Sequence, residues 1–116
     1  MIGPYGPFKL NNRFAFSNFS EWGAGHNRAF VSCIDRATGV HTVLDIGAHI
    51  GLVTLPLATK ISREGTVFAF EPGNSNREFL EQHLRINQIK NVTVVADLVG
   101  EKLNASANFY QSTSDS

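Results

Sequence analysis

The stretch from Thr42 to Gly51 constrains the fold of this 116-residue chain more than any other. It begins with a β-branched and apolar run, residues 42–46, that is typical of a buried parallel strand. Asp45 stands at the end of that run, and two glycines, Gly47 and Gly51, follow in the turn. An apolar pattern with helical spacing begins after them. We therefore predict a strand, a glycine-rich turn and a helix, in that order.

The turn that contains the two glycines is suited to hold a ligand against the backbone. Glycine has no Cβ, so a ligand can approach the main chain closely. The helix that follows offers unpaired N–H groups and the positive end of its dipole. Taken alone, however, the pair Gly47 and Gly51 is equally typical of an ordinary tight turn.

A second acid, at the end of a second strand, favours the ligand interpretation. Residues 66–71 read Thr-Val-Phe-Ala-Phe-Glu, which is typical of a strand that ends in Glu71. A carboxylate in this place can accept hydrogen bonds from both ribose hydroxyls of a nucleotide. Asp45 before the glycines and Glu71 after them make a nucleotide site the better explanation of the turn.

Length and charge limit the other possibilities. A chain of 116 residues, 42% of them hydrophobic, suits one small globular domain. Lys plus Arg and Asp plus Glu number 10 each, so no basic excess is available to hold a nucleic-acid backbone. No apolar run approaches the roughly 20 residues that span a bilayer, and the first residues lack the pattern of a signal peptide. With Cys33 as its one cysteine, we expect a cytoplasmic protein without disulfides or a cysteine-cluster metal site.

Residues 1–23 are expected to form an extended segment before the domain proper. They are rich in Gly, Pro, Asn and Phe, and the prolines favour extended or turn-like backbone. We predict that the aromatic side chains of this segment pack onto the domain, with a short strand at residues 13–17. The alternative is that the segment forms a lid over a pocket. The aromatic residues concerned are Phe14, Phe16 and Phe19.

Two helices are expected around the first strand. Residues 24–37 have helical periodicity, with Cys33 on the apolar side as a small core residue. Residues 22–27 either border a ligand or cap and anchor this helix. A second helix is expected over residues 50–62, and Pro56 should kink it, although an early position limits the damage.

A third helix and a third strand follow Glu71. Ser75 and Glu78 have the spacing of a capping box, which predicts a helix to about Asn87. His83 falls on the apolar side of this helix with Leu80 and Leu84, and we interpret it as a helix-surface residue rather than a ligand. We expect no metal site because no second histidine lies one turn away.

Residues 91–97 form the third predicted strand, again ending in an acid, Asp97. Residues 105–110 could start a further strand, so the expected domain spans residues 24–110. A polar tail, residues 111–116, completes the chain.

The alternation of strands and helices predicts an α/β fold with a parallel sheet, right-handed crossovers and helices on its faces. Ligands of such sheets bind beyond the carboxyl ends of the strands. Asp45, Glu71 and Asp97 are all expected at those ends. Three strands therefore deliver an acid to the same edge of the sheet.

The details of the turn narrow the choice of nucleotide. A dinucleotide-binding turn has the pattern Gly-x-Gly-x-x-Gly, and the segment Gly47 to Gly51 lacks the middle glycine. The chain has no Gly-Lys-Ser/Thr, so it has no P-loop. Asp45, just before the turn, is poorly matched to a pyrophosphate and well matched to an ammonium group. A ligand with a ribose, an adenine and a cationic amino-acid end fits these residues better, and S-adenosyl-L-methionine is such a ligand.

The same residues carry a family resemblance. Residues 43–51, Val-Leu-Asp-Ile-Gly-Ala-His-Ile-Gly, resemble motif I of class I methyltransferases, and residues 68–72, Phe-Ala-Phe-Glu-Pro, resemble the acidic motif after it. Together with residues 74–87 and 91–95, they are similar to the FkbM-type methyltransferases. The resemblance covers about residues 42–110. It implies a Rossmann-like parallel sheet with flanking helices and S-adenosylmethionine as the cofactor.

The resemblance implies a role for each residue of the turn. Asp45 would hold the ammonium group of the cofactor, directly or through water. Gly47, Ala48 and Gly51 would bring the backbone close to the cofactor. His49 would lie beside its amino-acid portion, in a place where family members usually carry asparagine.

The ribose and the adenine would bind to the later residues of the site. Glu71 would bind both ribose hydroxyls, and Pro72 would help to shape the adenine pocket. Asp97, or the backbone at Leu98, would meet the adenine amine. The resemblance does not identify a general base.

The resemblance also implies an incomplete enzyme. A full class I methyltransferase has more than the three or four strands expected here, and the fourth-strand motif that usually borders the methyl acceptor has no counterpart. We therefore expect the N-terminal, cofactor-binding part of an enzyme that methylates the hydroxyl of a small molecule or sugar, inactive by itself. Two alternatives stay open: an NAD(P)-binding Rossmann half, and a non-catalytic cofactor-binding or interaction module.

Overall fold

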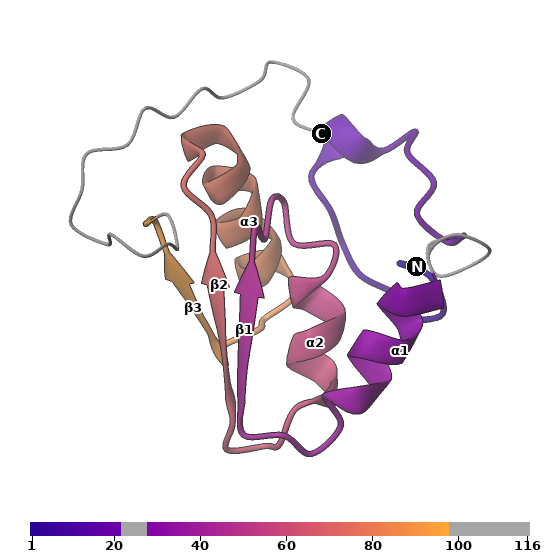
Figure 1. Ribbon diagram of the computed structural model, residues 1–116. Helices are drawn as coiled ribbons and strands as arrows, with labels where there is room; N and C mark the ends of the chain where they lie inside the picture. The colour runs from indigo at the N-terminus through magenta and orange to yellow at the C-terminus, as the bar shows by residue number, and fades with distance from the viewer. Residues whose placement is uncertain (22–27, 98–116) are drawn as a thin grey trace.

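The computed structural model describes residues 1–21 and 28–97, in which three parallel strands form one sheet (Figure 1). The strands are β1 (Thr42–Ile46), β2 (Thr66–Phe70) and β3 (Val92–Val95). Their spatial order is β1-β2-β3, so β2 is the central strand. The register pairs Thr42 with Thr66 and Ile46 with Phe70, which brings β1 and β2 to an end at the same level. The predicted α/β fold with a parallel sheet is confirmed.

The described helices cover one face of this sheet (Figure 1). Side chains alternate between the faces along a strand. Val67 and Ala69 of β2 face the helices and are fully buried. On the opposite face, the side chains of Leu44 and Ile46 are 60% and 62% exposed. Within the described residues, the expected helices are therefore found on one face only. They are α1 (Arg28–Arg36), α2 (Thr54–Lys60) and α3 (Asn74–Ile86), with a short 3-10 helix, η1 (Asn12–Phe14).

The core between the helices and the sheet consists of two apolar clusters. The first joins α1 and α2 to the sheet through Ile34, Leu57 and Val67. The second joins α2 and α3 to β2, and its members include Leu55, Leu80, Ala69 and Ala48 of the glycine-rich turn. Ile2, only 1% exposed, belongs to the second cluster. The N-terminal residues are therefore part of the domain, and they pack close to the turn.

Two predicted helix starts are wrong. The helix expected from residue 50 begins at Thr54, because Gly51 has a φ of +106°, which no α-helix contains. Pro56 is then the third residue of α2, so its missing N–H removes no helical hydrogen bond. The expected capping box is also absent: α3 begins at Asn74 after an N-cap at Gly73, which places Ser75 inside the first turn.

Several predictions about single residues are wrong as well. Residues 13–17 form no strand; η1 occupies part of this range, and the side chain of Asn11 caps it by accepting a hydrogen bond from Arg13 N. Phe16 is fully exposed, whereas Phe14 and Phe19 are half-buried and pack on the domain as expected. Cys33 is exposed and is not a core residue. His83 is completely buried and is not a surface residue.

Some expectations fall outside the described residues. These are the cluster at residues 22–27, the start of the helix expected from residue 24, Leu98, the strand expected at residues 105–110, and the tail at residues 111–116.

Candidate functional site

The candidate site lies where β1 and β2 end, at the turn from Gly47 to Gly51 (Figure 1). The backbone N–H groups of Gly47 and Ala48 both donate to the carbonyl oxygen of Phe70, at 2.9 and 3.0 Å. This pair of bonds ties the start of the turn to the end of β2. Gly47, His49 and Gly51 have φ values of +75°, +52° and +106°. The turn therefore uses left-handed backbone three times, which explains its glycines.

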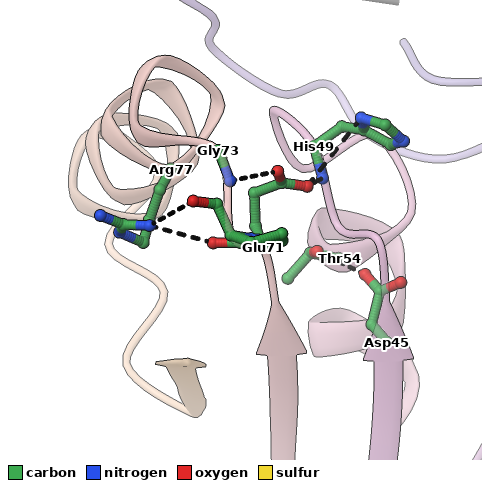
Figure 2. A network of polar contacts seen from close by, with 7 residues as sticks. Asp45, His49, Thr54, Glu71, Gly73 and Arg77 are labelled. Carbon is green, nitrogen blue, oxygen red and sulfur yellow. Dashed lines mark hydrogen bonds and ion pairs between the residues drawn. The ribbon is translucent and has the colours of Figure 1, made fainter. Parts of the chain in front are cut away.

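Glu71 joins the end of β2 to this turn. Its side chain is 4% exposed. One carboxylate oxygen, Oε1, accepts the backbone N–H of His49 at 2.7 Å, and the other, Oε2, accepts the N–H of Gly73 at 2.9 Å (Figure 2). A carboxylate oxygen has two lone pairs, so both oxygens keep acceptor capacity for a ligand. The structure thus places a buried acceptor in direct contact with the glycine-rich turn.

Arg77 braces the loop that carries Glu71. Its guanidinium donates to the carbonyl oxygens of Glu71 and Pro72, each at 3.2 Å, and to Oδ1 of Asn74 at 2.6 Å. Figure 2 shows the two carbonyl bonds converging on one nitrogen of Arg77. The rigid planar fork of arginine suits such multiple contacts. Arg77 therefore fixes the direction in which Glu71 leaves the strand.

The imidazole of His49 lies beside Glu71 on the outer side of the turn. The side chain is 55% exposed, and Nδ1 is 3.9 Å from Oε1 of Glu71. This contact is an ion pair only when the imidazole is protonated. The firm link between the two residues is the backbone hydrogen bond, which does not depend on the histidine side chain.

Asp45 is buried beneath the turn, next to the first turn of α2. The hydroxyl of Thr54 donates to Oδ2 of Asp45 at 2.6 Å (Figure 2). Burial raises the pKa of the Asp45 carboxyl, and the nearby Glu71 adds to this effect. The hydrogen bond from Thr54 and the neighbouring His49 act in the opposite direction. Asp45 is therefore a carboxylate whose charge would gain from a cationic ligand.

The two glycines of the turn face different surroundings. A Cβ added to Gly47 would have His49 Nε2, at 3.9 Å, as its nearest neighbour, so the space beside Gly47 is open. A Cβ added to Gly51 would lie 3.0 Å from Leu80 Cδ1 and 3.7 Å from Leu55 Cγ. The lack of a side chain at Gly47 thus leaves open space beside the turn, whereas the lack of one at Gly51 lets Leu80 of α3 pack against the turn.

The remaining expected site residues are placed less closely. Ala48 is 4% exposed, and its methyl group belongs to the core. Its backbone makes hydrogen bonds of the turn, to Phe70 and Gly51. Pro72 is half-buried and follows Glu71. Asp97 is exposed after β3, and among the described residues no hydrogen bond links it to Asp45, Glu71 or the turn.

Sequence reasoning missed three residues that support the site. Thr54 is a polar residue at the start of an apolar helix, and this contrast was the available signal. Arg77 gives no such signal, because its contacts depend on the shape of the loop at residues 71–74. The spacing of His83 with Leu80 and Leu84 predicts its place on the apolar side of α3, but its hydrogen bond to Ile50 gives no signal in the sequence.

The part of the chain that the structure describes contains no group of three or more His, Cys, Asp or Glu side chains that could hold a metal ion. In the same residues, no helix is long and apolar enough to cross a membrane.

Comparison with solved structures places this fold among methyltransferases. A candidate rRNA methylase from Clostridium thermocellum is 22% identical with a TM-score of 0.56, over 61% of this chain and 39% of its own. An rRNA methylase from Streptococcus thermophilus is 19% identical with a TM-score of 0.55, over 62% of this chain and 42% of its own. TYW2 from M. jannaschii, solved with AdoMet, is 22% identical with a TM-score of 0.55, over 84% of this chain and 41% of its own.

These similarities show that the chain shares its fold with methyltransferases, one of which, TYW2, was solved in complex with AdoMet. The chain spans less than half the length of these structures. No family model matches the chain, and no curated protein matches it.

Proposed function

We propose that this chain forms the cofactor-binding part of an S-adenosylmethionine-dependent methyltransferase. The observation that carries the proposal is the contact between Glu71 and the glycine-rich turn. A buried carboxylate at the end of β2 accepts the backbone N–H of His49 at 2.7 Å. A ribose bound by that carboxylate would therefore lie directly against the turn. The shared fold with an AdoMet-bound structure supports the same assignment.

The residues of the site fit this cofactor. Glu71 keeps acceptor capacity for the ribose hydroxyls. The space beside Gly47 is open, so the amino-acid part of the cofactor can pass close to the backbone. Asp45 would hold the ammonium group, directly or through water, and this cation would favour its ionised form. The cofactor supplies a methyl group activated by its sulfonium; the protein supplies orientation and removes water.

At the level of the family, we propose an FkbM-type enzyme that transfers the methyl group to oxygen. The support is the similarity of residues 43–51 and 68–72 to the motifs of that family. The φ of His49, +52°, fits this proposal, because the asparagine that the family usually carries there adopts left-handed backbone more readily than other side chains.

For the methyl acceptor, we propose a hydroxyl of a small molecule or sugar. Two of the similar structures are described as rRNA methylases, which makes RNA the second candidate. The net charge of zero favours the small molecule, since a chain without a basic excess gains little from phosphate contacts.

A cofactor panel measured by calorimetry tests the proposal. S-adenosylhomocysteine, which keeps the ribose, the adenine and the ammonium group, should bind and release heat. NADH should not bind, because the turn lacks the middle glycine of the dinucleotide pattern. Binding of NADH with no binding of S-adenosylhomocysteine would replace this proposal with a dinucleotide site. No binding of either would favour the non-catalytic interaction module.

A further inference from the structure

His83 is a buried polar residue whose two ring nitrogens both have partners. It lies on the core face of α3, beside Leu80 and Leu84, and it is fully buried. Its Nδ1 is 2.7 Å from the carbonyl oxygen of Ile50. Its Nε2 is 3.0 Å from the backbone nitrogen of Asn11. The ring therefore links α3 to two segments that are far away in the sequence.

These partners determine the form of the imidazole. The carbonyl oxygen of Ile50 can only accept, so Nδ1 must carry the hydrogen. The N–H of Asn11 can only donate, so Nε2 must be unprotonated. A neutral ring with the hydrogen on Nδ1 satisfies both contacts. Burial lowers the pKa of His83, against the opposing effect of the Ile50 carbonyl, and this agrees with a neutral ring.

The bond to Ile50 reaches the candidate site. Ile50 stands between His49 and Gly51, two residues whose φ values are +52° and +106°. The backbone N–H of His49 donates to Glu71, which follows β2. The carbonyl of Ile50 is bonded to His83 on α3. Two consecutive residues of the turn are thus held by groups from different parts of the fold.

The bond to Asn11 is part of a larger contact between α3 and the N-terminal segment, residues 1–21. The side chain of Asn11 donates to Gln82 Oε1 at 2.8 Å. Lys9 and Asn87 exchange two hydrogen bonds, at 2.8 and 2.7 Å. The ring of Phe14 packs edge-on against the imidazole of His83, with ring centres 5.7 Å apart. His83 therefore lies at the junction of the N-terminal segment, α3 and the turn.

We propose that His83 is a positioning residue that holds the glycine-rich turn in its cofactor-binding shape and connects that shape to the docked N-terminal segment. This inference rests on the proposed function. His83 touches no cofactor in this arrangement; it acts through the peptide that contains the Ile50 carbonyl.

Two substitutions of His83 test its two hydrogen bonds one at a time. The amide nitrogen of asparagine occupies about the position of Nδ1, so His83→Asn can keep the bond to Ile50. The amide oxygen of glutamine occupies about the position of Nε2, so His83→Gln can keep the bond to Asn11. Affinity for S-adenosylhomocysteine and unfolding in urea are measured for both variants. We expect a similar loss of stability in the two, but about tenfold weaker binding in His83→Gln than in His83→Asn. Equal affinities would overturn the positioning role and leave His83 as a core residue only.

Two matched substitutions of Asn11 test whether the N-terminal segment acts on the turn through His83. Asn11→Ala removes the side-chain bonds and keeps the N–H. Asn11→Pro removes the N–H as well, and the φ of Asn11, −56°, suits proline. We expect weaker cofactor binding in Asn11→Pro than in Asn11→Ala, by about threefold or more. The same affinity in both would refute the connection.

A measurement without ligand keeps this inference separate from the proposed function. The amide of Gly51 donates to the carbonyl of Ala48 at 3.0 Å, so its hydrogen exchange reports the shape of the turn. Exchange at Gly51 should be faster in His83→Gln than in His83→Asn. That result, together with no binding of S-adenosylhomocysteine to the unaltered protein, would refute the proposed function and support the role of His83. Equal exchange in the two variants would refute the role of His83.

Discussion

At the scale of single residues, the site depends on two carboxylates with different surroundings. Glu71 binds two backbone N–H groups and keeps acceptor capacity. Asp45 has one hydroxyl partner, Thr54, and its burial disfavours the charged form. Glu71 is therefore suited to accept hydrogen bonds from neutral hydroxyls, and the charged form of Asp45 would be stabilised by a nearby cation.

Glu71→Ala should weaken the binding of S-adenosylhomocysteine by about 1–3 kcal/mol, or roughly 5- to 150-fold. The physical reason is the loss of charge-assisted hydrogen bonds to the ribose. The variant should also be less stable, since the N–H groups of His49 and Gly73 lose their acceptor. Calorimetry gives the affinity, and urea unfolding gives the stability. Glu78→Ala, which removes an exposed acid on α3, is the control and should change neither quantity. An unchanged affinity in Glu71→Ala would remove Glu71 from the site.

Asp45→Asn should raise the stability of the folded protein at pH 7 and weaken its binding of the cofactor. The folded protein keeps the proton of Asp45 at higher pH than the unfolded chain does, because burial raises the pKa above its usual value of 3.8. Stability is therefore lost as the pH rises from that value through the raised pKa. The neutral asparagine avoids this loss. We expect the variant to be more stable than the unaltered protein at pH 7, with a difference that shrinks as the pH falls towards 3.8.

The same variant should bind S-adenosylhomocysteine about tenfold more weakly or worse, because it lacks the charge that faces the ammonium group in the proposed site. Urea unfolding across the pH range and calorimetry at pH 7 measure the two effects. A variant that gains stability and keeps its affinity would show that Asp45 does not hold the cation.

At the scale of elements, the positions of the strands could be predicted from the sequence more closely than the helix starts. Thr42–Ile46 is found as predicted, since runs of β-branched and aromatic residues between turns suit a pleated, half-buried surface. The other two strands are shorter than predicted: β2 is Thr66–Phe70 within residues 66–71, and β3 is Val92–Val95 within residues 91–97. The start of α2 depends on how far the left-handed turn extends, which is set by the packing of Leu80 against Gly51. At the start of α3, the N–H of the N-cap residue Gly73 donates to the side chain of Glu71. The contact of Leu80 with Gly51 joins residues that are far apart in the sequence, and a local pattern does not record it.

The two glycines of the turn should respond differently to the same substitution. Gly47→Ala and Gly51→Ala both force left-handed backbone on alanine, at about 1–2 kcal/mol each. The new methyl group of Gly51→Ala would also lie 3.0 Å from Leu80, whereas that of Gly47→Ala enters open space. We therefore expect Gly51→Ala to lose about 1–3 kcal/mol more in the free energy of unfolding, measured in urea. Gly47→Ala should mainly weaken cofactor binding. Equal destabilisation would mean that α3 shifts to accommodate the methyl group.

At the scale of the whole molecule, one face of the sheet stays apolar and uncovered by the described helices. Leu44 and Ile46 are 60% and 62% exposed there, and β1 has β2 as its one described neighbour. Parallel sheets are usually buried on both faces, and open apolar edges promote association. The similar methyltransferase structures are more than twice as long as the part they share with this chain. Within the described residues, the helices therefore cover one face of the sheet and leave the opposite face, with Leu44 and Ile46, exposed.

The 116-residue chain should consequently self-associate through this face, and Leu44→Lys should reduce that association. A lysine in the place of Leu44 adds a charge to an otherwise apolar strand surface, so two copies can no longer bury it together without desolvating the charge. Light scattering and sedimentation over a range of protein concentrations measure the effect. Val40→Lys is the matched control, because Val40 is also an exposed apolar residue, 38% exposed, but precedes β1 and does not lie on the sheet. Val40→Lys adds the same charge and should leave the association unchanged. An equal decrease of self-association in the two variants would mean that the added charge alone, and not the sheet face, controls the association.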